Sequence, residues 1–127
     1  MKYLGIDFGL HHLGLAINFD KLAEPLTQIS YQDGEKVVEK IASICRYEGI
    51  DQIVLGISEG KMADRTRGFG KRLHQTTGKI VNYQDETLTS QEAKEKSLEA
   101  GVPKERRGKI NHQTAAALIL QAFLDNQ

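Results

Sequence analysis

The sequence has little cysteine, no long apolar run and no net charge. Cys45 is the only cysteine among 127 residues, which excludes an intrachain disulfide and a cysteine-based zinc site. No apolar run approaches membrane-spanning length, and the first residues lead into a strand pattern without a signal region. The 17 Lys and Arg residues equal the 17 Asp and Glu residues, so the total charge does not indicate a nucleic-acid partner. We expect a cytoplasmic protein that does not associate with a membrane.

The basic residues are unevenly distributed along the chain. Nine of the 17 fall within two short stretches, namely Lys61, Arg65, Arg67, Lys71 and Arg72, and then Lys104, Arg106, Arg107 and Lys109. Such a concentration is enough for a local phosphate-binding patch. Charged stretches also form ordinary solvated faces of helices and loops, so both interpretations stay open. The side chains that we expect to contact phosphate are Arg65, Arg67, Arg106 and Arg107.

The order of apolar patterns predicts one α/β domain over residues 1–127, with a mixed sheet flanked by helices. A chain of this length buries one core without disulfide or metal cross-links. Three strand patterns come first, and helical and strand patterns alternate after them. We expect a hairpin within residues 2–18, further strands over 22–31, 51–57 and 79–84, and helices over 35–47, 67–76, 91–100 and from 111 onward. Residues 60–66 read as a polar loop, and Pro25 suits an edge strand because it donates no ladder hydrogen bond.

Asp7 is a carboxylate in an otherwise apolar strand pattern. Leu4, Ile6 and Phe8 fall on one face of the period-two pattern, and Asp7 falls on the other. A charge in a half-buried strand needs a metal ion, a basic side chain or backbone donors, because leaving it unpaired costs several kcal/mol. Asp7 also precedes a glycine-bearing turn that a phosphate could approach. From the residue alone, a purely local role in fixing that turn is slightly favoured, because such roles are common.

Two further acids, Asp85 and Glu86, follow the last strand pattern, and His112 lies near the start of the final helix. Ligands of open α/β sheets gather at the carboxyl ends of strands, so Asp7 meets the acid pair if their strands reach the same edge. Two carboxylates and a histidine offer ligands for Mg²⁺ or Mn²⁺, which activate water for phosphodiester cleavage. Spacing alone equally allows helix-dipole roles for the acids and an ordinary first-turn position for His112.

Five segments in a fixed order resemble the YqgF family, also called RuvX. They are LGIDFGLHHLGLAI, AEPL, DQIVLGIS, DETLTSQEAKEKSL and NHQTAAALILQAFL, and together they extend over nearly the whole chain. The resemblance implies a ribonuclease H-like fold with a five-stranded mixed sheet, related to the RuvC Holliday-junction resolvases. Members of the family are assigned as Holliday-junction resolvases or pre-16S ribosomal RNA nucleases. A metal-dependent nuclease is therefore the function that the resemblance implies.

The resemblance also implies roles for single residues. Asp7 matches the family's first-strand catalytic aspartate, and Glu86 matches the glutamate of its DER-like motif, with Asp85 as a supporting residue. His112 stands where the family has an aspartate, and it completes the implied catalytic and metal-binding set of Asp7, Glu86 and His112. Histidine suits Mn²⁺ or Zn²⁺ better than Mg²⁺, because hard cations prefer oxygen.

The chain departs from the family at several further positions. Thr87 replaces the arginine of the DER-like motif, and Ser58 stands where many relatives have proline. His11 and His12 occupy the hairpin turn in place of basic residues. We expect these two histidines to contact phosphate, more strongly as the pH falls toward about 6.5. Two exposed turn histidines without a role are an equally good interpretation.

The leading hypothesis is a cytoplasmic, divalent-metal-dependent endonuclease that acts on structured nucleic acid. Its expected reaction is 5′-end processing of pre-16S ribosomal RNA, with cleavage of branched DNA at Holliday junctions as the alternative. A second hypothesis is a module that binds nucleic acid without cutting it, because His112 departs from the family pattern. A third is a sugar-kinase-like ATPase, which the length disfavours because such enzymes need two domains. The sequence leaves monomer and homodimer open.

Overall fold

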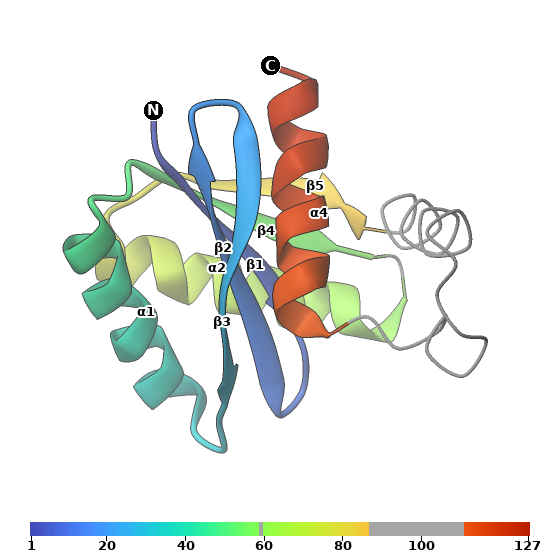
Figure 1. The fold of residues 1–127 in the computed structure, drawn as a ribbon. Helices are drawn as coiled ribbons and strands as arrows, with labels where there is room; N and C mark the ends of the chain where they lie inside the picture. The colour runs from blue at the N-terminus through green and yellow to red at the C-terminus, as the bar shows by residue number, and fades with distance from the viewer. Residues whose placement is uncertain (59, 87–110) are drawn as a thin grey trace.

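The computed structural model describes residues 1–58, 60–86 and 111–127, and within them five strands form one sheet (Figure 1). The strands are β1 (Tyr3–Phe8), β2 (His12–Phe19), β3 (Leu22–Ser30), β4 (Gln52–Ile57) and β5 (Val81–Asp85). The helices are α1 (Gly34–Glu48), α2 (Lys61–Thr77) and α4 (His112–Asp125). No helix in this described part is both long enough and apolar enough to cross a membrane.

The sheet has the order β3-β2-β1-β4-β5 and is mixed, as predicted. The first three strands pair antiparallel, whereas β4 runs parallel to β1 and β5 runs parallel to β4. β3 forms one edge, and the register of its ladder with β2 shifts where Ala16 lies opposite Pro25. A proline without an amide hydrogen is tolerated at such an edge bulge. The carboxyl ends of β1, β4 and β5 therefore point in the same direction, which is the condition for their end residues to meet.

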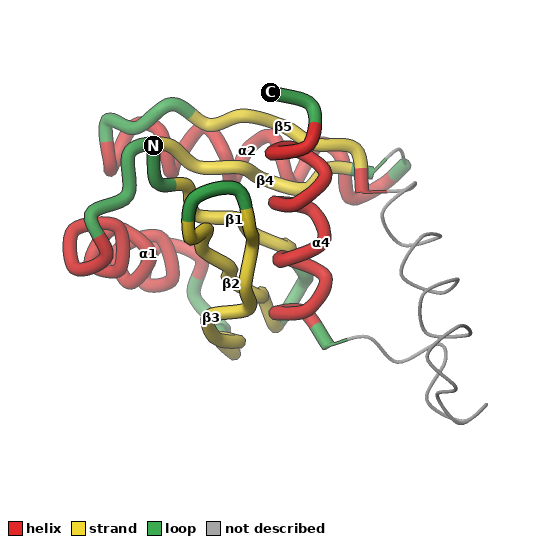
Figure 2. Tube along the Cα trace, turned by 45° about the horizontal axis from the view of Figure 1, so that its top comes forward, coloured by secondary structure: helices red, strands yellow, loops and turns green. Residues whose placement is uncertain are grey.

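Helices α1 and α2 pack on one face of the sheet, and α4 packs on the other (Figures 1 and 2). Leu4 and Ile6 of β1 are fully buried in one cluster with Ile41 of α1 and with Phe69 and Leu73 of α2. This cluster also includes Cys45, which is buried. The strands thus send their large apolar side chains to the α1 and α2 face.

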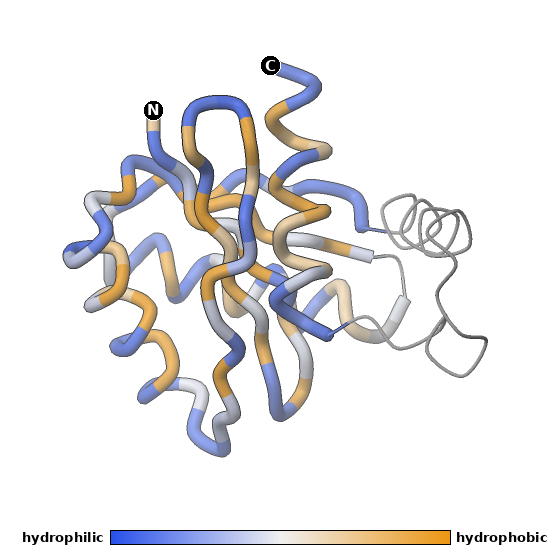
Figure 3. The backbone as a smooth tube through the Cα atoms, viewed as in Figure 1, coloured by the Kyte–Doolittle hydropathy of each residue, from blue (hydrophilic) through white to orange (hydrophobic). Residues whose placement is uncertain are grey.

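Helix α1 shows how local sequence sets the element boundaries. The Asp33 side chain accepts hydrogen bonds from the amides of Glu35 and Lys36, and Gly49 ends the helix in the left-handed conformation at φ 66°. Between these caps, apolar and polar residues alternate along the turns (Figure 3), and the apolar ones are buried against the sheet. The helix therefore begins and ends within a residue of the predicted 35–47.

The α4 face is filled by small residues instead. Ala16 of β2 and Val54 of β4 pack against Ala116 and Leu120 of the helix. A side chain at Gly14 would overlap the backbone of α4, since a Cβ there would meet the carbonyl group of His112. The lack of a side chain at this position lets the start of α4 lie directly on the sheet.

The structure corrects two predicted boundaries. The prediction of a loop over 60–66 is wrong, because α2 begins at Lys61 instead of residue 67. Gly60, which precedes the helix, makes no side-chain capping bond, so the usual start signal is missing from the sequence. β5 begins at Val81 rather than residue 79. The predicted helix over 91–100 and the basic loop over 102–109 lie outside the described residues.

Candidate active site

Two carboxylates from distant parts of the chain meet on the α4 face of the sheet. Asp7 lies near the end of β1, and Glu86 immediately follows the last residue of β5. Their side chains share a hydrogen bond across the strand β4 that lies between them. Gly56 of β4 makes this possible, because a Cβ at that position would lie 2.9 Å from Glu86 Oε2. The side chain of Glu86 thus crosses above Gly56 to reach Asp7.

The environment of Glu86 favours its protonated form. Burial is the main cause and, together with the negative charge of Asp7, raises the pKa of Glu86 from 4.5 to about 7. A hydrogen bond from the Ser58 side chain acts in the opposite direction and lowers this pKa, while the bond to Asp7 and the charge of Asp85 raise it. Near neutral pH, Glu86 is therefore protonated in part of the molecules. A cation would remove the repulsion that keeps the proton there.

His112 approaches the same carboxylate from the first turn of α4. Its Nδ1 lies 2.7 Å from Asp7 Oδ2, and the two side chains are 38% and 15% exposed. Two contacts fix the start of the helix: Asn111 Oδ1 accepts a bond from the Thr114 amide at 2.8 Å, and Gln28 Oε1 accepts one from the His112 amide at 3.2 Å. The predicted helix start at Asn111 is confirmed. Asp7 is therefore in contact with both Glu86 and His112, the two other members of the predicted site.

The hairpin turn adds a second histidine ring. The ring of His12 lies nearly parallel to that of His112, with centroids 6.1 Å apart and planes inclined by 21°. The Nδ1 atom of His12 is 2.9 Å from Ser30 Oγ, which ties the turn to the end of β3. His11, the next residue in the turn, is exposed. His12 thus lies beside His112, and contact of His11 or His12 with phosphate stays a prediction.

Ser58 belongs to the site but was not among the predicted site residues. Ser58 directly follows β4, the strand that lies between β1 and β5 in the sheet. Its side chain forms a hydrogen bond with Glu86. Its place at the carboxyl end of a central parallel strand was a usable signal. The departure from the family's proline at this position is therefore a departure within the site itself.

The donor set suits a hard divalent cation only in part. Two adjacent carboxylates provide the oxygen atoms that Mg²⁺ and Mn²⁺ prefer, with water completing the coordination. In residues 1–58, 60–86 and 111–127, no three His, Cys, Asp or Glu side chains stand together in positions ready to hold a metal ion. The Nδ1 atom of His112 contacts Asp7, so Nε2 is the ring nitrogen that could bind a metal ion. Coordination by His112 stays a prediction.

The two predicted basic residues that the structure describes, Arg65 and Arg67, lie away from the carboxylates. Arg65 and Arg67 are exposed on α2, on the sheet face opposite the carboxylates. Arg67 makes an ion pair with Asp64 at 3.6 Å, in which both side chains are solvent-exposed. The other two predicted phosphate contacts, Arg106 and Arg107, lie outside the described residues.

Comparisons with known proteins identify relatives that match this chain over nearly its full length. The model of the family described as "RuvX: Holliday junction resolvase" matches residues 1–126. A protein of Syntrophus aciditrophicus named "Putative pre-16S rRNA nuclease" is 35% identical over 134 residues, covering 98% of this chain and 89% of the relative. A protein of the same name from Anaeromyxobacter is 35% identical over 136 residues, covering 100% of this chain and 98% of the relative.

Solved structures share the fold at low sequence identity. The chain superposes on RuvC of Thermus thermophilus, solved in complex with a Holliday junction substrate, with a TM-score of 0.66 and 15% identity, covering 99% of this chain and 94% of RuvC. The fowlpox virus Holliday junction resolvase gives a TM-score of 0.57 at 11% identity, with full coverage of both chains. These neighbours confirm the expected ribonuclease H-like fold. Because the family model matches residues 1–126 of this chain, the chain belongs to the RuvX family.

Proposed function

We propose that residues 1–127 act as one divalent-metal-dependent endonuclease unit in the cytoplasm, which hydrolyses phosphodiester bonds at the 5′ end of pre-16S ribosomal RNA. The observation that carries this proposal is the hydrogen-bonded contact between Asp7 and Glu86, two carboxylates that are 79 positions apart in the chain and adjacent on the α4 face. Two neighbouring carboxylates repel each other when both are ionised, which destabilises the fold, whereas a bound cation removes this repulsion.

Each residue of the site has a distinct role in this proposal. Asp7 and Glu86 would hold Mg²⁺ or Mn²⁺, which supplies Lewis-acid activation of water and of the phosphodiester. Ser58 holds the Glu86 carboxyl and lowers its pKa, so this residue favours the ionised form that a cation needs. Asp7 fixes the ring of His112 through Nδ1, which leaves Nε2 for a cation or for a proton of the reacting groups.

The choice of ribosomal RNA rests on the relatives. Proteins about one-third identical to this chain, aligned over nearly their full length, carry the name of a pre-16S rRNA nuclease. Branched DNA is the second candidate substrate, because the matching family model is described as a Holliday junction resolvase. Both are structured nucleic acids, and phosphate contacts do not distinguish them.

The direct test measures cleavage by the wild-type protein and by Asp7→Asn and Glu86→Gln. End-labelled precursor rRNA spanning the 5′ processing site and a four-way DNA junction are each incubated with Mg²⁺, with Mn²⁺ or with EDTA. We expect metal-dependent cleavage of the RNA by the wild-type protein, and at least a hundredfold loss in both variants, because each removes a carboxylate needed to hold the ion. Glu39→Gln, which changes an exposed acid on α1, is the matched control and should cleave normally.

The outcomes separate the candidate functions. Cleavage of the DNA junction but not of the RNA would replace the proposed substrate while keeping the site. Binding of either substrate without products under every metal would favour the non-cleaving module. Normal cleavage by Asp7→Asn would overturn the assignment of the active site.

A further inference from the structure

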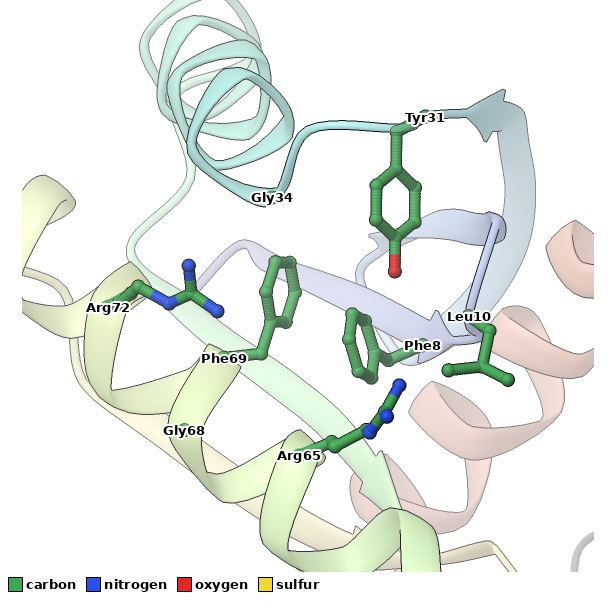
Figure 4. Close-up of a pocket in the computed structure, with 8 residues that line it drawn as sticks. All are labelled: Phe8, Leu10, Tyr31, Gly34, Arg65, Gly68, Phe69 and Arg72. Atoms are coloured by element: carbon green, nitrogen blue, oxygen red, sulfur yellow. The ribbon is translucent and has the colours of Figure 1, made fainter.

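A cavity of about 350 Å³ lies on the α1 and α2 side of the sheet, beside the end of β1 (Figure 4). It is lined by three segments that are far apart in sequence: the end of β1 with the turn after it, the stretch from the end of β3 to the start of α1, and α2. The lining residues used here are Phe8, Leu10, Tyr31, Arg65, Phe69 and Arg72. The volume falls in the lower part of the range of roughly 300–1,000 Å³ that is typical of small-ligand sites.

The cavity has a rigid aromatic wall. The rings of Phe8 and Phe69 are stacked, with centroids 4.3 Å apart and planes inclined by 16°, and Phe69 is only 1% exposed. Tyr31 contributes a third, nearly parallel ring 6.3 Å from Phe8. Phe8 remains partly exposed, and Leu10 at the edge of the cavity is 51% exposed. A flat ring placed against Phe8 would therefore extend a stack that is already fixed from behind.

The rim of the cavity is positively charged. Arg65 and Arg72 are both exposed, and Figure 4 shows their guanidinium groups directed toward the aromatic rings. No carboxylate in the described ranges forms an ion pair with either arginine, unlike Arg67, which pairs with Asp64. A guanidinium without a carboxylate partner is available for bidentate binding of phosphate. The preferred ligand is thus a flat ring joined to a phosphate.

The cavity is also mechanically linked to the acidic residues. Phe8 follows Asp7 directly, and their side chains leave the same strand end on opposite faces. The hydroxyl of Tyr31 donates a hydrogen bond to the carbonyl oxygen of Gly9, and the Gly9 amide donates to the carbonyl oxygen of His12 at 2.9 Å. One wall of the cavity therefore braces the turn that carries the histidine stacked on His112.

We propose that this cavity binds an unstacked nucleotide of a single-stranded segment next to the cleavage position, with its base against Phe8 and its phosphate held by Arg65 and Arg72. The proposal rests on the nuclease function proposed above. Proteins that read single strands commonly stack splayed bases on aromatic side chains and hold the backbone with basic ones. A strand that passes around the end of β1 would contact the cavity on one face and the carboxylates on the other.

Binding is tested in EDTA with the Asp7→Asn protein, so that cleavage plays no part. Fluorescence anisotropy follows a labelled 12-nucleotide single-stranded RNA as salt is raised. We expect Arg72→Ala and Arg65→Ala each to weaken binding about tenfold and to reduce the salt slope by about one, as loss of one phosphate contact does. Arg46→Ala, which removes an exposed arginine from α1, is the matched control and should bind normally. Unchanged binding by both cavity variants, or no binding by the parent protein, overturns the proposal.

The base contact is tested with a fluorescent reporter in the cavity. The chain has no tryptophan, and Leu10 is exposed, so Leu10→Trp introduces a single fluorophore at the edge of the cavity. We expect the 12-nucleotide RNA to quench it, and expect an abasic ribose-phosphate oligomer of equal length to quench it at least fivefold less, because stacking requires a base. Equal quenching by both oligomers overturns the base contact. Equal quenching by a free mononucleotide at the same concentration overturns the assignment to a substrate strand.

The two proposals fail separately. A wild-type protein that binds single-stranded RNA through Arg65 and Arg72 without cleaving any substrate contradicts the nuclease function and leaves the nucleotide site standing. A protein that cleaves normally as Arg65→Ala and as Arg72→Ala, with unchanged KM and unchanged binding, keeps the nuclease function and rejects the nucleotide site.

Discussion

The two faces of the sheet are built from the same strands but are filled in opposite ways. On the α1 and α2 face, β1 and β2 present large side chains such as Leu4 and Leu15, which are fully buried in the main core. On the α4 face, the same strands present Asp7, Gly14 and Ala16. The first face stabilises the domain by burying large apolar side chains. On the second face, the small side chains of the strands allow a helix to lie close to the sheet.

This difference explains where the proposed active site is located. A carboxylate such as Asp7 can be accommodated only on a face that also supplies a polar partner, because an unpaired buried charge is costly. The small residues of the α4 face provide that partner by letting the start of α4 bring His112 onto Asp7. Adjacent residues of β2 therefore serve different ends: Leu15 fills the core, and Gly14 leaves room for the site.

The largest expected loss of stability comes from the large-residue face. Leu15→Ala removes a fully buried side chain and leaves a cavity, so we expect the free energy of unfolding to fall by about 3–4 kcal/mol in urea denaturation. The residual folded protein should cleave at a nearly normal rate at low temperature, because the change lies on the face away from Asp7. A rate loss much larger than the unfolded fraction explains would contradict this separation of the two faces.

The neighbouring change on the α4 face should have the reverse profile. Gly14→Ala places a methyl group against the backbone of α4 at His112, so we expect about 2–3 kcal/mol of destabilisation from the clash. Cleavage should fall well beyond the unfolded fraction, because the displaced helix moves His112 away from Asp7. Lys40→Ala is the control: Lys40 is exposed on α1, and a surface change of this kind alters stability by no more than about 0.5 kcal/mol. Equal activity in Gly14→Ala and Lys40→Ala would show that contact with α4 does not matter to the site.

The smallest effect concerns the charge of Glu86 in the metal-free protein. Its folded pKa of about 7 exceeds the unfolded value of 4.5, so the folded state binds the proton more tightly. The stability from this proton is complete below about pH 4.5 and is lost as the pH rises through 7. Glu86→Gln should therefore match the wild type at pH 4.5 and exceed its stability at pH 8 by about 1–2 kcal/mol, after allowance for solvent screening.

The measurement for this prediction is thermal unfolding in EDTA across that pH range. Glu39→Gln on the exposed side of α1 should show no such crossover. Saturating Mg²⁺ should reverse the order at pH 8, because the ion stabilises the wild-type protein and has lost a ligand in the variant. An unchanged difference between Glu86→Gln and the wild type from pH 4.5 to 8 would show that burial and the charge of Asp7 do not raise the pKa of Glu86 in solution.

Much of the fold could be predicted from local patterns, because caps and apolar periodicity are determined by residues close together in the chain. The period-two pattern around Asp7, the capped amphipathic helix α1 and the Asn111 cap of α4 all act within a few residues. The start of α2 was missed because Gly60 offers no capping side chain. The meeting of Asp7 and Glu86 was foreseen from the rule for strand ends and from the family resemblance together.

Apart from the meeting of Asp7 and Glu86, the contacts between distant segments could not be predicted from the sequence. The bond from Ser58 to Glu86 depends on the order in which β1, β4 and β5 pair, and no periodicity in the chain reports that order. The bond between His112 and Asp7 depends on how closely α4 approaches Gly14. The cavity beside Phe8 is formed by three distant segments. Of the lining residues used above, only Arg65 had been predicted to contact phosphate.

The 105 positions between Asp7 and His112 also have a consequence in time. A ribosome adds about 5–20 residues per second, so β1 is synthesised roughly 5–20 s before His112. Until α4 docks on the strands, the histidine is not held against Asp7. A growing chain that is still on the ribosome, surrounded by ribosomal RNA, therefore lacks the contact between His112 and Asp7 until α4 has emerged.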